Sequence, residues 1–489
     1  MKNLSTILFF ALAMTGCREN NEIIETKSET DADINNIVTT ASQYGNSTTS
    51  RSSVSPANTI SYDGKNVKIS VLSRNAGDTE NSPIFKYGDL INRAIAYKNQ
   101  HPSTDVQIKF VMYKMSSEAY VGFDPSDINS YGFVKGNDFG GVHSEKLIYS
   151  IVKAALNQVK IDFVYHLDEG NTNTYNYING FMENPCTTDN TKKVKDYLRI
   201  RKITWGKESN QQMHAKYLTV NYYSGDNGAD ETNTILSTTG NVDSHGATGI
   251  PSGKDWVQSG ILVNGHPQLM SSYNSYFDLI FENYNNQEAF KNAVRTKHSS
   301  NSLNYDDTYF SSYFTPIPLN PAGNYTYVPQ TGDGSPSNGN AWDTSFNPVA
   351  KYVDDMASLP GNRYIKVNMY HLKTDNFGKK FYEKLKDIYN SESSGLKHFR
   401  FVVNTNSYNS IFPLSNFNNI GIIKSSATTH SKDVLFAFSG LSRYYTITGS
   451  TNLKLDDNAS KANSSLVVKE YTAAHPIYNE FKTIFEYQY

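Results

Sequence analysis

Two short motifs built from the same residue types stand far apart in this chain of 489 residues, His214-Ala215-Lys216 and His430-Ser431-Lys432. Each leads through a β-forming stretch to a hydroxyl-rich segment that ends on asparagine, Thr238 to Asn241 in one case and Gly449 to Asn452 in the other. Histidine, with an unperturbed pKa of about 6.5, can act as a nucleophile or a general acid near neutral pH. Lysine supplies positive charge, and Ser, Thr and Asn donate directional hydrogen bonds. The duplicated pattern therefore predicts chemistry on an anionic group.

The spacing inside each motif predicts how these side chains are presented. On a strand, residues i and i+2 face the same side, so each histidine should project together with its lysine. Two such faces brought together would form a site of two imidazoles and two ammonium groups, which suits a phosphodiester. The predicted catalytic residues are His214, His430, Lys216 and Lys432, and the predicted phosphate-binding residues are Asn241, Asn452, Ser450 and Thr239.

The arrangement resembles the duplicated motif of the phospholipase D superfamily, His-x-Lys-x4-Asp followed by Gly-Ser-x-Asn. The second copy matches with Gly449, Ser450 and Asn452 after its histidine and lysine. The first copy keeps the asparagine but has Thr238 and Thr239 where the family has Gly and Ser. Both copies depart from the pattern at the motif's aspartate, where this chain has Asn221 and Ala437.

The resemblance implies a two-step displacement without a metal or cofactor. His214 would attack phosphorus to form a phosphohistidine, and His430 would protonate the leaving oxygen and then activate water, although the roles could be reversed. The lysines and asparagines of both motifs would stabilise the equatorial oxygens. The chain also lacks His-x-His or HExxH spacing and a cysteine set, so no metal site is predicted.

In many members of the superfamily an acidic residue past the motif's asparagine orients the catalytic histidine. The corresponding stretches of this chain contain Asp255 and Gln258 in the first copy, and Asn463 and Ser464 in the second. None of the four is a clear equivalent by sequence. Together with the missing motif aspartates, this leaves open a slow enzyme or a phosphate-binding member without activity.

The beginning of the chain predicts export. An apolar run from Leu4 to Met14 follows Lys2 and precedes Thr15-Gly16-Cys17. The run is too short to cross a bilayer as a helix, and small residues before a cysteine resemble the bacterial lipobox. Residues 1–17 are thus predicted to be a lipoprotein signal peptide with Cys17 as the lipidated residue, the alternative being an ordinary signal peptide. Residues 18–58 are polar and predicted to be a disordered tether.

The rest of the chain is predicted to form two similar halves. The pattern of apolar residues indicates strands at 67–72, 106–112 and 159–164 and helices at 87–100 and 145–156 in the first half. The second half repeats the plan with helices at 348–357 and 377–389 and strands at 364–369 and 398–403. Near their ends, His266-Pro267 and His475-Pro476 open similar segments. The predicted boundaries are 59–315 for the first half, 316–347 for a linker and 348–489 for the second half.

The predicted fold class is α/β, with two phospholipase D-like half-domains, each a mixed β-sheet flanked by helices, related by a pseudo-two-fold axis. The leading functional prediction is a phosphodiesterase of the cell envelope, anchored to a membrane by its lipid, acting on a phospholipid. The near balance of 45 Lys and Arg against 47 Asp and Glu does not favour nucleic acid. A nuclease of the same superfamily remains the alternative, and no protein partner is predicted.

Overall fold

The computed structural model describes the body of the chain in twelve stretches: 58–62, 65–74, 83–115, 144–168, 173–225, 229–242, 257–318, 342–359, 363–373, 375–391, 398–405 and 414–489. The predicted signal peptide with Cys17, nearly all of the predicted tether, and residues 319–341 of the predicted linker lie outside these residues. Within them, no helix is long and apolar enough to cross a membrane.

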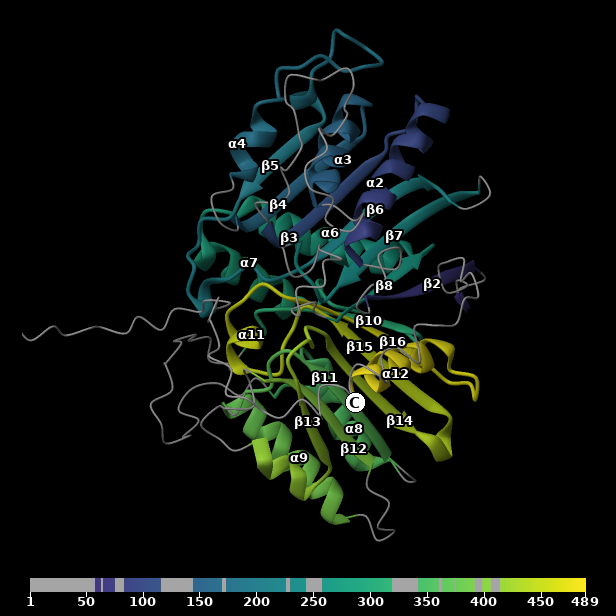
Figure 1. The fold of residues 1–489 in the computed structure, drawn as a ribbon, viewed down its shortest axis with the longest axis vertical. Helices are drawn as coiled ribbons and strands as arrows, with labels where there is room; N and C mark the ends of the chain where they lie inside the picture. The colour runs from purple at the N-terminus through teal and green to yellow at the C-terminus, as the bar shows by residue number, and fades with distance from the viewer. Residues whose placement is uncertain are drawn as a thin grey trace, which may run out of the picture.

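The first half is built on an eight-stranded mixed sheet (Figure 1). Its strands in spatial order are β1 (Asn58–Tyr62), β2 (Lys65–Arg74), β8 (Gln258–Asn264), β7 (Asp230–Thr238), β6 (Tyr217–Ser224), β3 (Gln107–Met115), β4 (Lys160–Asp168) and β5 (Leu198–Lys202). Strands β3, β4 and β5 are parallel, and the other neighbours are antiparallel. Helices α2 (Pro83–Gln100) and α3 (Ser144–Leu156) share one apolar core with this sheet.

The second half is built on a second eight-stranded mixed sheet. Its strands in spatial order are β13 (Ile422–Ser426), β12 (His398–Asn404), β11 (Arg363–Met369), β14 (Lys432–Phe438), β15 (Arg443–Gly449), β16 (Ser464–Glu470), β10 (Phe310–Phe314) and β9 (Tyr305–Asp306). Helices α8 (Pro348–Ser358) and α9 (Asn376–Ser391) cover one face and form an apolar core with it. Strand β11 lies between parallel β12 and antiparallel β14, as β3 lies between β4 and β6.

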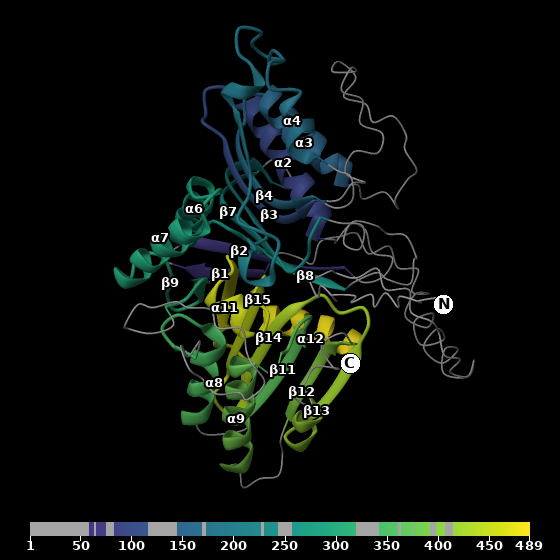
Figure 2. The same cartoon turned by 90° about the vertical axis from the view of Figure 1, so that its left-hand side faces the viewer.

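A third apolar core joins the two halves. It contains buried residues from α6 (Pro267–Glu282) and α7 (Gln287–Ser299), from the strands of both sheets, and from α12 (Pro476–Gln488). Figure 2 shows the two sheets meeting in the middle of the molecule, where α12 also lies, with α8 and α9 on the outer side of the second sheet. Strands β9 and β10 precede residue 316 in sequence, yet they belong to the second sheet, where β10 pairs with β16 and β9 pairs with β10. The chain therefore passes from one sheet to the other before the predicted linker begins.

The predicted fold, two similar α/β halves with mixed sheets and flanking helices, is confirmed. The predicted strands at 67–72 and 106–112 lie within β2 and β3 or at their edge, and the two His-Pro segments open α6 and α12. The halves also exchange equivalent backbone hydrogen bonds. The N–H of His214 donates to Ala462 O at 2.8 Å, and the N–H of His430 donates to Val257 O at 3.0 Å. This reciprocity is what a pseudo-two-fold axis requires.

A buried histidine in this fold gives a testable pH dependence of stability. The ring Nε2 of His298, in α7, lies 3.1 Å from Phe314 O, and burial lowers the pKa of His298 to about 4. An unfolded histidine titrates near pH 6.5, so the unfolded chain takes up the proton first as the pH falls. The neutral, buried His298 therefore contributes fully to the stability of the fold above about pH 6.5. As the pH falls to about 4 this contribution is lost, and the free energy of unfolding decreases by about 3 kcal/mol.

The measurement is the free energy of unfolding in urea between pH 4.5 and 7.5 for the parent and His298→Gln. The variant should be less stable than the parent at pH 7.5, and the difference should shrink towards pH 4.5. The same substitution at His101, whose side chain is only partly buried, controls for the loss of a histidine. A difference that stays constant across the range would contradict the prediction.

Candidate active site

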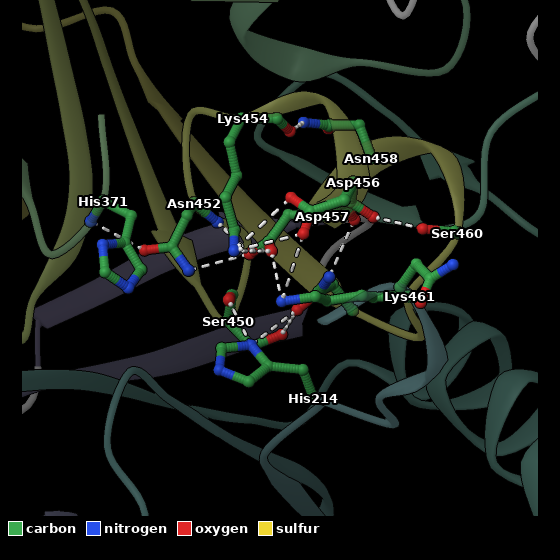
Figure 3. Close-up of polar contacts among 12 residues, drawn as sticks. His214, His371, Ser450, Asn452, Lys454, Asp456, Asp457, Asn458, Ser460 and Lys461 are labelled. Carbon is green, nitrogen blue, oxygen red and sulfur yellow. Dashed lines mark hydrogen bonds and ion pairs between the residues drawn. The ribbon is translucent and has the colours of Figure 1, made fainter. Parts of the chain in front are cut away.

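His214 is held at the seam between the two halves by groups from the second half. It precedes β6, and its Nδ1 lies 3.0 Å from Ser450 O and 2.9 Å from Asn463 Oδ1 (Figure 3). A backbone carbonyl can only accept a hydrogen bond, so Nδ1 carries the proton. The other ring nitrogen, Nε2, then has a lone pair. This is the tautomer that a nucleophilic histidine needs.

The lysines of both motifs are buried at the same seam. Lys432 Nζ donates to His430 O and to Thr239 O, both at 3.0 Å, and the second of these bonds crosses to the first half. Lys216 Nζ donates to His214 O at 2.7 Å. Both histidines and both lysines are buried. The structure thus brings the four predicted catalytic residues into one site, although the two motifs are far apart in the chain.

Burial and neighbouring cations keep both imidazoles neutral. Burial holds the pKa of His214 well below its usual range, and the Lys216 ammonium adds to the effect. Burial likewise lowers the pKa of His430, with further contributions from Lys432, Lys216 and His214 itself. That His214 contributes to the pKa of His430 is a second sign that the rings share one site. A bound phosphodiester anion would bring negative charge and favour the imidazolium form.

The motif asparagines are buried, and Asn452 is held in a defined orientation. Its Oδ1 accepts a hydrogen bond from the backbone N–H of His371 at 3.1 Å. Its backbone N and its Nδ2 both donate to Asp457 Oδ2, at 2.9 and 2.8 Å. An amide nitrogen carries two hydrogens, so Nδ2 has a second N–H for a phosphate oxygen. Asn241, the equivalent residue of the first copy, is also buried.

The hydroxyls of Ser450 and Thr239 bond to neighbouring strand starts. Ser450 Oγ accepts from Ser464 N at 3.0 Å and donates to Asn463 Oδ1 at 3.1 Å. In the first half Thr239 Oγ1 accepts from Ser259 N at 3.0 Å and donates to Ser259 O at 3.1 Å. These bonds fix the ends of β15 and β7. In this structure both hydroxyls therefore hold the backbone around the site.

Two amides stand where an acidic residue was expected to orient the histidines. Asn463 contacts His214, as described above. Gln258 precedes Ser259 as Asn463 precedes Ser464, and is therefore its pseudo-two-fold equivalent. A Cβ added at Gly240 would lie 1.7 Å from Gln258 Oε1, so glycine there makes room for the buried Gln258 side chain beside Asn241. Asp255 lies outside the described residues.

The positions of the missing motif aspartates lie within the sheets. Asn221 Oδ1 accepts from Gln107 N, and its Nδ2 donates to Asp105 O, both at 2.8 Å, so this amide joins β6 to the start of β3. Ala437 is buried in β14 between Tyr364 of β11 and Tyr444 of β15. Neither residue contacts the motif histidines in the described hydrogen bonds.

Sequence reasoning missed a pair of tyrosines that contact the motifs. Tyr113 lies just past the last residue of β3 that pairs with β6, and Tyr370 lies just past the last residue of β11 that pairs with β14. The two tyrosines therefore occupy equivalent positions in the two sheets. The ring centroid of Tyr113 lies 4.9 Å from that of His214, and the centroid of Tyr370 lies 4.5 Å from that of His430. Each ring also faces the lysine of its motif, at 5.1 Å for Lys216 and 5.4 Å for Lys432. Cation–π contact stabilises such buried ammonium groups. A tyrosine directly follows each of the predicted strands 106–112 and 364–369, and this repeat was the available signal.

A carboxylate beside Lys432 links the halves once more. Asp433 accepts hydrogen bonds from Ser259 Oγ at 2.8 and 2.7 Å and from Thr448 Oγ1 at 2.7 Å. Burial raises the pKa of Asp433 to about 6, and these hydrogen bonds act in the opposite direction. Among the described residues, no three His, Cys, Asp or Glu side chains are grouped in a way that could hold a metal ion.

Comparison with known proteins yields structural likenesses only. No protein-family model and no curated protein matches the chain. The structure is similar to polyphosphate kinase from Porphyromonas gingivalis (TM-score 0.46, 10% identity, covering 86% of this chain and 50% of the kinase). It is similar to phosphatidylserine synthase from Haemophilus influenzae Rd KW20 (0.46, 9%, 86% and 86%). It is also similar to Nuc of Salmonella typhimurium, a phospholipase D family member (0.25, 11%, 45% and 95%). The chain thus spans half the length of that kinase.

The bond between Asn463 and His214 can be tested without any assay of activity. In protein labelled with ¹⁵N in its histidines, His214 should show a protonated Nδ1 and an unprotonated Nε2 at neutral pH, assigned with His214→Gln. Asn463→Leu removes one of two acceptors and should weaken this preference. Asn463→Asp keeps an acceptor and adds negative charge, so it should keep the tautomer and raise the pKa of His214. A parent protein with its proton on Nε2 would contradict the assignment.

Proposed function

We propose that this protein is a phosphodiesterase of the phospholipase D type, which hydrolyses a phosphodiester through a phosphohistidine intermediate. One observation carries the proposal: two His-x-Lys pairs meet in a single buried site, and Nδ1 of His214 is bound to two acceptors. That hydrogen bonding leaves the lone pair on Nε2, where a nucleophile needs it.

In the first step the Nε2 lone pair of His214 attacks phosphorus, and a bond from phosphorus to nitrogen forms. The bond from phosphorus to the leaving oxygen breaks, and His430, protonated in the complex with the anionic substrate, donates a proton to that oxygen. In the second step His430 takes a proton from water, and the water oxygen attacks phosphorus. The bond from phosphorus to His214 then breaks, and the product carries the phosphoryl group. His214 returns to its neutral form, and His430 ends the cycle as the imidazolium with which it began.

The surrounding groups would stabilise the charge on phosphorus. Lys216 and Lys432 supply two positive charges beside the rings, fixed by bonds to backbone carbonyls. Asn241 and Asn452 are the remaining candidates to donate to equatorial oxygens. Because these donors are fixed before substrate binds and are buried, they need little reorganisation in the transition state. Removal of one such donor typically costs about 3 kcal/mol of transition-state stabilisation.

A phospholipid is the favoured substrate class, and the support comes from the sequence. A lipid on Cys17 would hold the site near a bilayer, and the nearly balanced charge does not favour DNA or RNA. Other phosphodiesters fit the same chemistry. A nuclease is the alternative that the assay below distinguishes.

The test is incubation of the body of the protein with vesicles of choline, ethanolamine and glycerol phospholipids, and separately with single- and double-stranded DNA. Release of headgroup should persist in EDTA. His214→Ala and His430→Ala should each lower turnover by about 10³-fold or more, because nucleophile and acid act as a unit. His101→Ala, at a partly exposed position outside the two motifs, is the matched control and should keep parental turnover. Acid quenching on a labelled substrate should trap label on His214.

Three outcomes would change the proposal. Label on His430 would reverse the two roles. Cleavage of DNA without headgroup release would identify a nuclease. Loss of turnover in EDTA with recovery on adding a divalent ion would refute the mechanism itself.

We propose in addition that a lipid on Cys17 anchors the protein to a membrane of the cell envelope. The support is the short apolar run and the small residues before this cysteine. Expressed in a bacterial host, the parent should pellet with membranes, and Cys17→Ser should appear in the soluble fraction. Cys186→Ser is the matched control, because Cys186 is a buried cysteine in the body. A Cys17→Ser protein that stays in the pellet after a high-salt wash would show that the anchor lies elsewhere.

A further inference from the structure

A buried aspartate lies between two lysines next to the site. Asp457, in the short helix α11 (Leu455–Ala459), is completely buried. Its Oδ1 lies 3.2 Å from Lys454 Nζ and 2.9 Å from Lys461 Nζ. Figure 3 shows this cluster above His214, with Asn452 to its left. The proposed chemistry does not use any of the three charged groups.

The other oxygen of the same carboxylate holds a predicted phosphate-binding residue. Asp457 Oδ2 accepts two hydrogen bonds from Asn452, one from the backbone N and one from Nδ2. With Oδ1 of Asn452 held by the backbone of His371, the amide cannot flip without breaking bonds on both sides. The second N–H of Asn452 is therefore aimed by Asp457.

The backbone of Asp457 fixes the amide that contacts His214. Asp457 O accepts a hydrogen bond from Asn463 Nδ2 at 2.8 Å. Because a carbonyl can bond only to the NH₂ end of this amide, the oxygen end of Asn463 must face His214 Nδ1. One residue thus sets the orientation of both amides around the reacting atoms.

The charge of the Asp457 carboxylate also acts on His214. Burial alone would raise the pKa of Asp457, but Lys454 and Lys461 outweigh it and hold this pKa well below its usual range. The carboxylate is therefore ionised. The charged groups that act on His214 are Lys216, Lys461 and Lys432, which disfavour its protonation, and Asp457, which favours it.

We propose that Asp457 is a positioning residue for the phosphodiesterase reaction, acting through Asn452 on the phosphate and through Asn463 on His214. The inference rests on the proposed function, because it assigns a role within the same site. Asp457 supplies a negative charge near His214 that neither Asn463 nor Gln258 can provide. The charge stands one residue away from the ring instead of in contact with it.

The neighbouring residue offers a matched control. Asp456 lies 3.4 Å from Lys454 and 3.9 Å from Lys461, and thus belongs to the same charge cluster. The described contacts of its side chain are with these two lysines. A residue that only neutralises lysines would give equal effects at both positions, whereas a positioning residue would not.

The first readout is the binding of inorganic phosphate, measured by titration calorimetry. Asp457→Leu and Asn452→Ala should each weaken phosphate binding by roughly ten- to hundredfold, the scale for a lost hydrogen bond to a charged group. The double variant should bind no more weakly than the weaker single variant, since Asp457 acts through Asn452. Asp456→Leu should weaken phosphate binding less than either of these single variants, because the described contacts of its side chain are with Lys454 and Lys461. Additive losses, or an equal loss at Asp456, would overturn the proposal.

The second readout is the ¹⁵N titration of His214 in Asp457→Asn, a nearly isosteric change that serves also if Asp457→Leu fails to fold. Loss of the negative charge should lower the pH at which His214 titrates. Adding Lys461→Met should restore it towards the parental value, because one positive charge is removed with the negative one. An unchanged titration in Asp457→Asn would contradict the role of Asp457.

These results separate the inference from the function on which it rests. A parent protein that binds no phosphate and cleaves no phosphodiester contradicts the proposed function. A parent that does both, with Asp457→Leu behaving like it, contradicts only the role of Asp457. With an active parent, Asp457→Asn should also shift the acidic limb of kcat/KM to lower pH, while Asp456→Asn should not.

Discussion

The burial of four ammonium groups around two imidazoles is the constraint on which the rest of the site depends. These are the side chains of Lys216, Lys432, Lys454 and Lys461, and all are buried. A buried charge without partners costs several kcal/mol, so each must be compensated inside the protein. The first pair is compensated by backbone carbonyls and tyrosine faces. The second pair is compensated by Asp457. The geometry of the site follows from where these partners can be placed.

Neither half could place them alone. The carbonyl of Thr239, from the first half, accepts from Lys432 of the second, and His214 of the first half bonds to Ser450 and Asn463 of the second. The shared apolar core behind the seam holds both sheets in register while these bonds form. A site assembled this way is rigid before substrate arrives, which is the condition for electrostatic stabilisation of a transition state. Duplication therefore supplies more than a second histidine, because each copy completes the surroundings of the other.

The sequence predicted the parts of this arrangement that are written in local patterns. Alternation and helical spacing predicted the main strands and helices, and the repeated His-x-Lys pairs predicted which residues would meet. It could not select Asn463 over Ser464, because that choice depends on which carbonyls and rings the other half brings close. Asp457 was missed for the same reason, since its partners converge only after α11 folds onto the seam. The pairing of β10 with β16 in the second sheet likewise depends on tertiary contacts and has no signature in its own five residues.

The use of amides in place of an orienting acid changes how the site handles protons. A carboxylate in contact with Nδ1 would fix the ring and also favour its charged form, whereas Asn463 fixes the ring while adding no charge. With four ammonium groups nearby, both imidazoles are then neutral in the free protein, and burial is the leading cause. That state suits the nucleophile, but it leaves the general acid without the proton that it must donate. The negative charge of the substrate itself can raise the pKa of the general acid, because an anion between the rings favours protonation of whichever histidine faces the leaving oxygen. In the proposed mechanism the site becomes competent for acid catalysis only when a phosphate is bound, and the proposed role of Asp457 includes setting how far the phosphate must raise the pKa of the histidine.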